Sequence, residues 1–173
     1  MKSIIALVDH TLTWNQPKAM KSDYELHFGG NIVATMKFPK MLSSTAVGQS
    51  GDGSWIFERK GAFNTRIIVT QTETGTQTGV FTPQPFKGGG IVQLEKGKQV
   101  LLRHNFWKSI FELTTEEGES LVQFTSHGFF RQIVDVQINR RALQFSELPW
   151  LVMLAFYIIL LGRRDAAAHA AVS

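Results

Sequence analysis

The sequence SELPWLVMLAFYIILLGRR, residues 146–164, decides the fold of this chain. Ser146 is a favourable N-terminal helix cap, and Glu147 suits the positive end of a helix dipole. Gly162 is a natural C-terminal stop, because glycine accepts the backbone conformation that ends many helices. These signals predict a helix over about residues 146–162.

The body of this helix has no polar face, since only the Trp150 indole and the Tyr157 hydroxyl carry polar atoms. A helix that is apolar on every side must be surrounded by lipid or by protein. The apolar run 148–161 is about 21 Å long, whereas a bilayer core needs about 20 apolar residues. We therefore expect a buried helix, and a tail-anchored membrane protein held through 148–161 is the alternative. The expected core residues of the helix are Trp150, Leu151, Leu154, Phe156, Ile158 and Leu161.

Apolar and polar residues alternate in much of the preceding chain. In residues 31–38 the period of two predicts a strand with one buried face. Its expected inward residues are Ile32, Ala34, Met36 and Phe38, with Val33 as the exception. Residues 134–138 repeat the pattern, and the apolar segment 4–8 is also predicted to be a strand.

Glycine-containing turns separate these strands, as at 29–30, 51–53 and 88–90. Glycine supplies the positive φ that tight hairpins require. Short strands at close spacing are typical of sandwiches and barrels, and the intervals are too short for crossover helices, so the sheet should be antiparallel. We count about ten to twelve strands between Tyr24 and Asn139.

The strands and the helix support a common architecture. An apolar helix laid on an open sheet would leave a large apolar surface in water, and closing the sheet around it removes that surface and the sheet edges. The expected fold is therefore mainly β, a closed antiparallel β-barrel of about ten to twelve strands that encloses the C-terminal α-helix. We expect residues 1–164 to form one domain and residues 165–173, DAAAHAAVS, to form a flexible tail.

The strand segment SWIFERKG at 54–61 and the helix segments LPWL at 148–151 and YII at 157–159 add detail to this layout. Together they resemble the tubby C-terminal-like superfamily, which includes tubby-like, phospholipid-scramblase-like and LURP-one-related proteins. The resemblance implies a barrel around a central helix and, for some members, binding of phosphoinositide lipids or action at membranes. Since no lipid-site or calcium-loop motif matches residue by residue, the resemblance assigns no site residue.

Composition excludes several classes of protein. The content of 43% hydrophobic and 18% charged residues is that of a globular protein, and zero cysteines exclude disulfides and thiolate zinc sites. The 18 basic residues are spread along the chain at a net charge of +4, which argues against a nucleic-acid partner. The short apolar run near the start is unlike an export signal. We expect a cytoplasmic monomer.

No residue pattern indicates catalysis, a metal site or a cofactor. The five histidines lack paired metal spacing, and no nucleophile elbow or phosphate loop is present. His104 follows the register of neighbouring core residues and is expected to be a hydrogen-bonded structural residue. The triplet 88–90 is expected to be a hairpin turn, and Glu116, Glu117 and Glu119 a solvated hairpin tip.

The expected function is a noncatalytic module that binds an anionic membrane phospholipid or a protein partner, which allows peripheral attachment to a membrane. The alternative is a small ligand carrier or enzyme with a site at the barrel mouth. Candidate headgroup ligands are Arg140, Arg141, Arg163, Arg164, Lys96 and Lys98, with Lys87 as a further basic hairpin residue. The two arginine pairs should lie at opposite ends of the barrel, and Arg163 and Arg164 also suit the negative end of the helix dipole.

Overall fold

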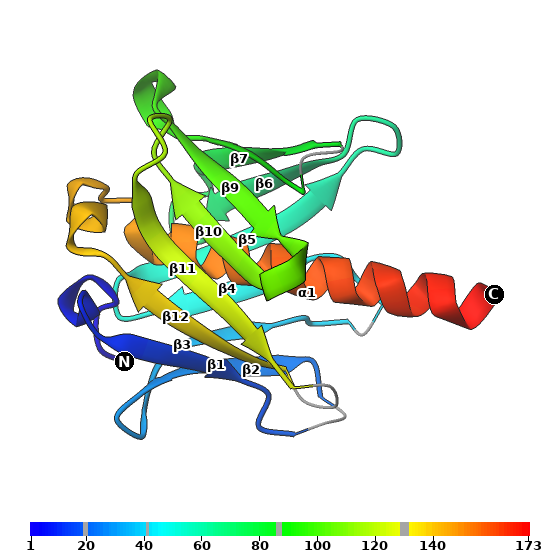
Figure 1. Cartoon of the computed structure of the whole chain (residues 1–173), viewed down its shortest axis with the longest axis horizontal. Helices are drawn as coiled ribbons and strands as arrows, with labels where there is room; N and C mark the ends of the chain where they lie inside the picture. The colour runs from blue at the N-terminus through cyan, green and yellow to red at the C-terminus, as the bar shows by residue number, and fades with distance from the viewer. Residues whose placement is uncertain (19–20, 41, 86–87, 129–131) are drawn as a thin grey trace.

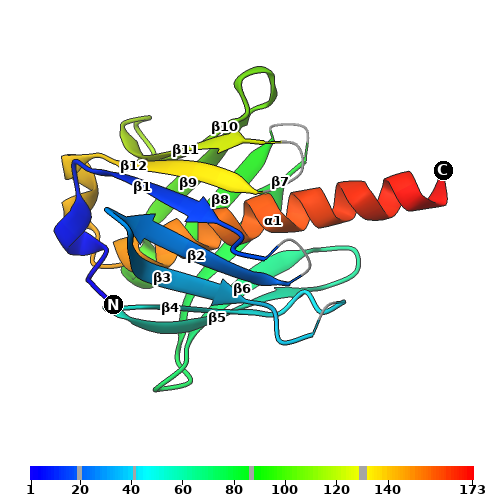
Figure 2. The same ribbon diagram turned by 90° about the horizontal axis from the view of Figure 1, so that it is seen from below.

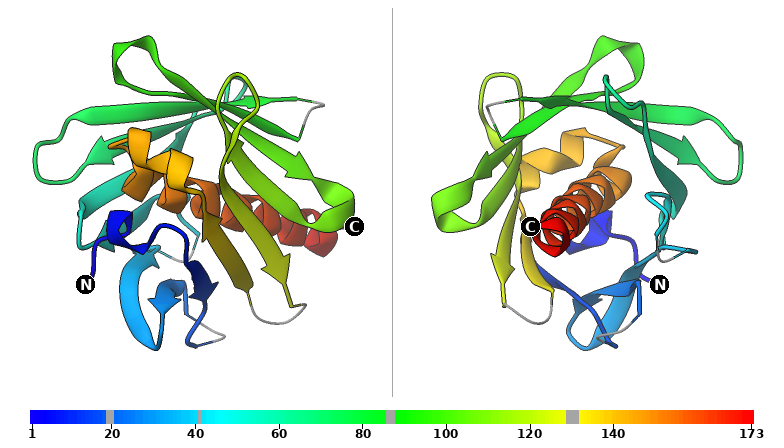
Figure 3. Two further views of the ribbon diagram at one scale, coloured as in Figure 1. Left: turned by 60° about the vertical axis from the view of Figure 1, so that its left-hand side comes forward. Right: turned by 90° about the vertical axis from the view of Figure 1, so that its right-hand side faces the viewer.

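The computed structural model describes residues 1–18, 21–40, 42–85, 88–128 and 132–173. Twelve antiparallel strands follow one another around a closed barrel, and β1 (Thr11–Asn15) pairs with β12 (Ile133–Ile138) to complete the ring. The strands surround the first part of α1 (Leu148–Val172), as the right-hand view of Figure 3 shows along the helix axis, and the rest of the helix projects from the barrel in Figure 1. The predicted fold class is confirmed.

The remaining strands alternate in direction between the two ends of the barrel. They are β2 (Asp23–Phe28), β3 (Asn31–Lys37), β4 (Ala46–Ser50), β5 (Gly53–Lys60), β6 (Arg66–Gln71), β7 (Gln77–Gln84), β8 (Gly89–Gln93), β9 (Gln99–Asn105), β10 (Ile110–Thr114) and β11 (Ser120–His127). Short 3-10 helices are η1 (Ile5–Leu7), η2 (Glu95–Gly97), η3 (Phe106–Lys108) and η4 (Arg140–Gln144). The prediction of a strand over residues 4–8 is wrong, because the first helical turn lies there.

The inward face of β3 differs from the simple alternation. The pairing of β2 with β3 shifts between Leu26 and His27, so that β3 carries one extra residue at Val33. Val33 is therefore buried, whereas Ile32 is 39% exposed. The prediction that Ile32 faces the core is wrong because a bulge reverses the direction of its side chain.

The enclosed part of α1 fills the barrel with close contacts. The Phe156 ring stacks on Trp14 of β1 with centroids 4.2 Å apart. Trp150 packs directly on β7, where a Cβ at Gly79 would lie 2.5 Å from its ring. The Tyr157 hydroxyl donates a hydrogen bond to the Ser44 carbonyl, and burial raises the pKa of Tyr157. All residues from 148 to 161 are buried except the partly exposed Ile158.

Both predicted boundaries of the helix need correction. Its N-cap residue is Glu147 with no side-chain cap, and the Ser146 hydroxyl bonds to the Glu147 carboxylate instead. The helix continues through Gly162 to Val172, so residues 165–173 are not a separate segment past a glycine stop. Alanine is the strongest helix former, and the five alanines after Asp165 outweigh a single glycine, which costs about 1 kcal/mol. Consequently the arginines at 163 and 164 do not lie in the last turn.

The two ends of the barrel differ in what covers them. At the closed end, where α1 begins, η1 and η4 lie across the opening, and Ile4, Leu7 and Ala142 are buried there (Figure 2). The backbone N–H of Ile4 donates to Asp52 Oδ2 at 2.7 Å, which ties the first segment to the β4–β5 turn. At the opposite end, here called the exit end, α1 leaves the barrel and projects beyond the loops (Figure 2).

Within the described ranges, no helix combines the length and the apolar character that crossing a bilayer requires. The apolar run 148–161 instead matches the height of the barrel, whose strands are 5 to 8 residues long.

Candidate functional site

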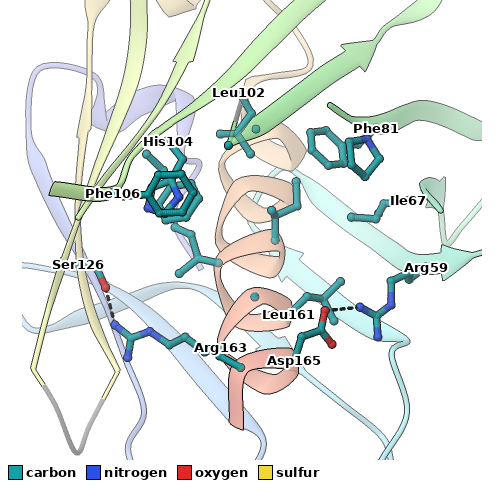
Figure 4. A pocket seen from close by; sticks show the side chains of 18 of the residues that line it. Arg59, Ile67, Phe81, Leu102, His104, Phe106, Ser126, Leu161, Arg163 and Asp165 are labelled. Atoms are coloured by element: carbon teal, nitrogen blue, oxygen red, sulfur yellow. Dashed lines mark hydrogen bonds and ion pairs between the residues drawn. The ribbon is translucent and has the colours of Figure 1, made fainter. Parts of the chain in front are cut away.

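A cavity of about 610 Å³ opens at the exit end, between α1 and the strands from β5 to β11. Ile67, Phe81, Leu102 and Ile158, none of which carries a polar side-chain atom, line it together with the stacked rings of His104 and Phe111. Arg59, Ser126, Arg163 and Asp165 lie nearer to the point where the helix leaves the barrel (Figure 4). An apolar recess with a few polar groups at its mouth is typical of a ligand site.

The side chain of Ile158 is partly exposed because it borders this cavity. Ile158 lies one turn before the helix leaves the barrel, among residues that are otherwise buried. Its side chain packs against the core and also lines the cavity, which leaves part of it open to the recess. The sequence predicted Ile158 as a core residue, and the structure places it partly exposed in the cavity wall.

Two glycines shape the wall on β8. A Cβ at Gly89 would lie 2.0 Å from the Leu102 carbonyl oxygen, and one at Gly88 would lie 2.6 Å from the Phe106 ring. Gly88 lies in the turn, as predicted for the triplet 88–90, but Gly89 belongs to β8. Lys87 lies outside the described residues.

Arg59 and Asp165 form an ion pair across the mouth of the cavity. Arg59 Nη1 lies 2.7 Å from Asp165 Oδ2, which joins β5 to the helix (Figure 4). Both side chains are partly exposed, so solvent screens the attraction. The pair leaves no net charge.

The two neighbouring arginines point in different directions. Arg164 lies 3.7 Å over the Phe38 ring and donates to the Ser43 carbonyl at 3.0 Å, so it fastens α1 to the β3–β4 loop. Arg163 lines the cavity and donates to Ser126 Oγ at 2.5 Å. Burial lowers the pKa of Arg163, although a guanidinium stays charged at neutral pH. The structure therefore separates the predicted pair into an anchor, Arg164, and a cavity residue, Arg163.

His104 lies in the cavity wall rather than in a hydrogen-bond network. Its ring stacks on Phe111 with centroids 3.7 Å apart and lies 4.0 Å from the centroid of Phe106. Burial lowers the pKa of His104, so the imidazole is neutral at pH 7. Stacking therefore holds the ring, and the hydrogen bond expected for His104 is not among those of the described residues.

The loops of the exit end expose large apolar side chains. Leu42, Phe63 and Trp107 are 100%, 100% and 99% exposed, and they lie on the β3–β4, β5–β6 and β9–β10 connections. Phe106, beside Trp107, is also exposed. Residues this apolar on three separate loop tips form an unusual surface for a protein in water.

The charges of the two ends differ. The described residues of the six exit-end connections include Lys18, Lys21, Lys40 and Lys108 and no Asp or Glu. The segments of the closed end mix the two signs, with more acids than bases. They contain Asp9, Asp52, Glu73, Glu95, Glu116, Glu117, Glu119 and Glu147 beside Lys2, Lys96, Lys98, Arg140 and Arg141.

The remaining predicted headgroup residues lie at this closed end. Arg140 lies 3.4 Å from Asp9 and Arg141 lies 3.8 Å from Glu119. Lys98 borders a shallow hollow with Glu116 and Glu117, and Lys96 lies on the same η2 turn. Because acids accompany these four bases, they do not form a basic patch, and they lie at the opposite end from Arg163 and Arg164.

In the described part of the chain, no cluster of three or more His, Asp or Glu side chains could hold a metal ion.

Comparison with solved structures finds an X-ray structure of a protein from Arabidopsis thaliana, AT5G01750. The TM-score is 0.55 at 11% sequence identity, and the match covers 89% of this chain and 93% of that chain. The two proteins share a fold. No protein-family model matches the sequence, and a search of curated proteins finds no match.

Sequence reasoning kept a site at the barrel mouth only as the alternative, named none of the residues that line the cavity's apolar wall as site residues, and missed the apolar loop tips. It treated the barrel interior as filled, because the helix is apolar on every side and the strand alternation does not show which inward positions meet the helix. Exposed Phe63 and Trp107 carried a usable signal, since each stands in a short turn between two strands where polar residues are expected.

Proposed function

We propose that the protein is a noncatalytic binding module that attaches to an anionic membrane surface through the exit end of its barrel. The observation that supports this most strongly is that Leu42, Phe63 and Trp107 are fully exposed on three different loops of one end. The lysines of the same loops favour an anionic surface over a neutral one.

The energetics suit a reversible attachment. Burying one large apolar side chain is worth about 1.5–3 kcal/mol, and tryptophan is favoured at membrane interfaces because its ring is apolar and its indole N–H is polar. Each lysine near an anionic surface adds about 1 kcal/mol, which salt screens. The central helix contributes nothing to this attraction, since its apolar side chains already lie inside the barrel.

The projecting end of α1 limits the orientation. Because residues 166–172 extend beyond the loops, an upright barrel would push the helix tip into the bilayer first (Figure 2). A tilted barrel avoids this and brings the cavity side of the mouth, with Phe63 and Trp107, against the surface. The helix tip then lies along the interface.

The resemblance to the tubby C-terminal-like superfamily also supports a membrane function, since some members bind phosphoinositide lipids. The fold shared with the Arabidopsis protein is consistent with that resemblance. The proposal moves the contact to the exit end, where Arg163 and Arg164 are the predicted headgroup residues among those that the structure describes.

Cosedimentation with vesicles tests the proposal. The protein is mixed with phosphatidylcholine vesicles, with and without phosphatidylserine, at low and at physiological salt. We expect binding to the anionic vesicles only, weaker at higher salt. The double variant Phe63→Ser, Trp107→Ser should bind at least about tenfold more weakly, because each tenfold corresponds to about 1.4 kcal/mol.

The matched control is the double variant Ile32→Ser, Leu143→Ser, which removes two exposed apolar side chains away from the exit end and should bind like the wild type. Equal binding to both kinds of vesicle, or unchanged binding by the loop variant, would exclude this mode of attachment. Binding to neither kind at low salt would leave a protein partner as the ligand of the exposed loops.

A further inference from the structure

The cavity at the exit end is a separate feature from the loop tips, and it lies inside the barrel wall. Its volume of about 610 Å³ is within the range of small-molecule sites. The recess away from the helix exit is lined mainly by aliphatic and aromatic carbon, from Ile67, Phe81, Leu102 and Ile158, and the His104 ring in the same wall is stacked on Phe111. A polar ligand group placed there would lose its hydrogen bonds to water without replacement, so this recess suits an apolar chain.

The charge balance at the mouth defines the other end of the ligand. Asp165 neutralises Arg59 at 2.7 Å, and His104 is neutral because burial lowers its pKa. Arg163 is bound only to the neutral Ser126 hydroxyl and has no carboxylate within ion-pair distance among the described residues. Among the described residues, the mouth therefore carries one uncompensated positive charge, that of Arg163, beside an apolar recess.

We infer that this cavity binds one amphiphile with a single alkyl or acyl chain and an anionic headgroup. The chain lies along Ile158 and Leu102, and the headgroup accepts hydrogen bonds from Arg163 and Ser126. A carboxylate or phosphate placed there gains charge-assisted hydrogen bonds, which are stronger than neutral ones. A headgroup with a single negative charge matches the one free cation among the described residues better than a polyanion such as a nucleotide does.

The same chemistry has two sources, a free fatty acid and the acyl chain of a membrane phospholipid. A site at the barrel mouth that faces the proposed membrane contact can take its ligand from either. The inference does not depend on membrane attachment, because a cavity of this kind also binds a monomeric fatty acid from solution.

The first experiment uses the full chain without vesicles. A dansyl-labelled undecanoate is bound, and palmitate, hexadecanol and hexadecyltrimethylammonium displace it at concentrations below those at which they form micelles. We expect palmitate to displace the probe best and the cationic amphiphile least. Ile158→Trp, which fills the cavity, should abolish probe binding, whereas Ile32→Trp, which adds the same ring on the outer surface, should not.

The second pair of variants tests the headgroup. Arg163→Gln should weaken palmitate about tenfold, the usual effect of losing one charge-assisted hydrogen bond, and leave hexadecanol unchanged. Arg163→Lys should recover most of the palmitate affinity. Arg140→Gln, at the closed end, removes an arginine of the same chain without touching the cavity and should have no effect.

A last arm identifies the source of the ligand. Vesicles that contain a phospholipid with a fluorescent acyl chain are mixed with the protein, and transfer of the label to the protein is measured after separation. Transfer indicates an acyl chain drawn from the bilayer, and displacement by palmitate alone indicates a free fatty acid. Unchanged probe binding in folded Ile158→Trp, or equal affinity of Arg163→Gln and wild type for palmitate, would overturn the inference.

Discussion

The closed end and the exit end of the barrel are built from the same kinds of strand and turn, yet they differ in packing and in exposed side chains. At the closed end η1 and η4 cover the core, and Arg140 and Arg141 have carboxylate partners. At the exit end the wall opens into a cavity, and the loops expose apolar side chains beside lysines. The difference teaches that one helix fills only part of this barrel, so that one end is closed by packing and the other contains a cavity.

The largest expected effect concerns the part of α1 that both ends share. Leu154→Asp places a carboxylate at a fully enclosed position and should unfold the protein, with a loss above about 4 kcal/mol. Ala167→Asp, on the projecting part of the same helix, should leave the melting temperature nearly unchanged. Circular dichroism during heating measures both. A folded Leu154→Asp protein with the wild-type melting temperature would show that the helix is not central to the core.

A pair of truncations compares the filled and the open side of the interior. Trp150→Ala removes a ring packed on Gly79 and should cost about 3–5 kcal/mol, as large truncations in a core do. Ile158→Ala should cost about 1 kcal/mol or less, because the side chain already borders an open cavity and little packing is lost. Urea denaturation measures both. Equal losses would mean that the cavity is closed in solution.

The pH dependence of stability tests the cavity wall. Burial lowers the pKa of His104 in the folded protein below its ordinary 6.5, so the unfolded chain takes up a proton first as the pH falls. The contribution of His104 to stability is therefore fully present above pH 6.5 and is lost as the pH falls below it. His104→Phe should flatten the stability curve between pH 7 and 5. An unchanged slope in this variant would contradict a lowered pKa of this partly buried imidazole.

The smallest effect is expected outside the barrel. Deleting residues 166–173 should change stability by less than about 0.5 kcal/mol, because these side chains are exposed apart from a contact of Ala166 with the cavity mouth. The deletion must keep Asp165, whose pair with Arg59 is worth about 0.2–1 kcal/mol when partly exposed. A calorimetric loss of more than about 2 kcal/mol would mean that the projecting turns pack against the barrel.

The sequence was sufficient for the architecture because the decisive feature is local. The apolar run 148–161 is too short to cross a bilayer and too apolar for a protein surface, so it predicts a helix enclosed by protein. The strands are predicted from the alternation of apolar and polar residues, which is visible in the sequence. The bulge at Val33 was hidden, since one extra residue reverses the outward and inward positions without changing composition. The helix end was misplaced because Gly162 is a stop signal only where stronger helix formers do not follow.

The candidate site was less predictable, because it depends on partners that are distant in the chain. Arg140 and Arg163 look alike in sequence, but one lies beside Asp9 and the other beside Ser126, at separations of more than 30 residues. The sequence gives the charge of each side chain, whereas the fold determines whether a side chain of opposite charge neutralises it. Only the second quantity decides whether an arginine is available to a ligand.

The order of elements along the chain has consequences for folding. Apart from the closing pair of β1 and β12, every strand pairs with its immediate neighbour in sequence, so hairpins can form early and at low entropic cost. The helix α1, which fills the interior, follows all twelve strands in sequence, so it is synthesised after the strands of the barrel. Until then the inward faces of the hairpins have nothing to pack against, and their apolar side chains are open to aggregation or to a chaperone. Closing the ring and inserting α1 should therefore be one cooperative, late event.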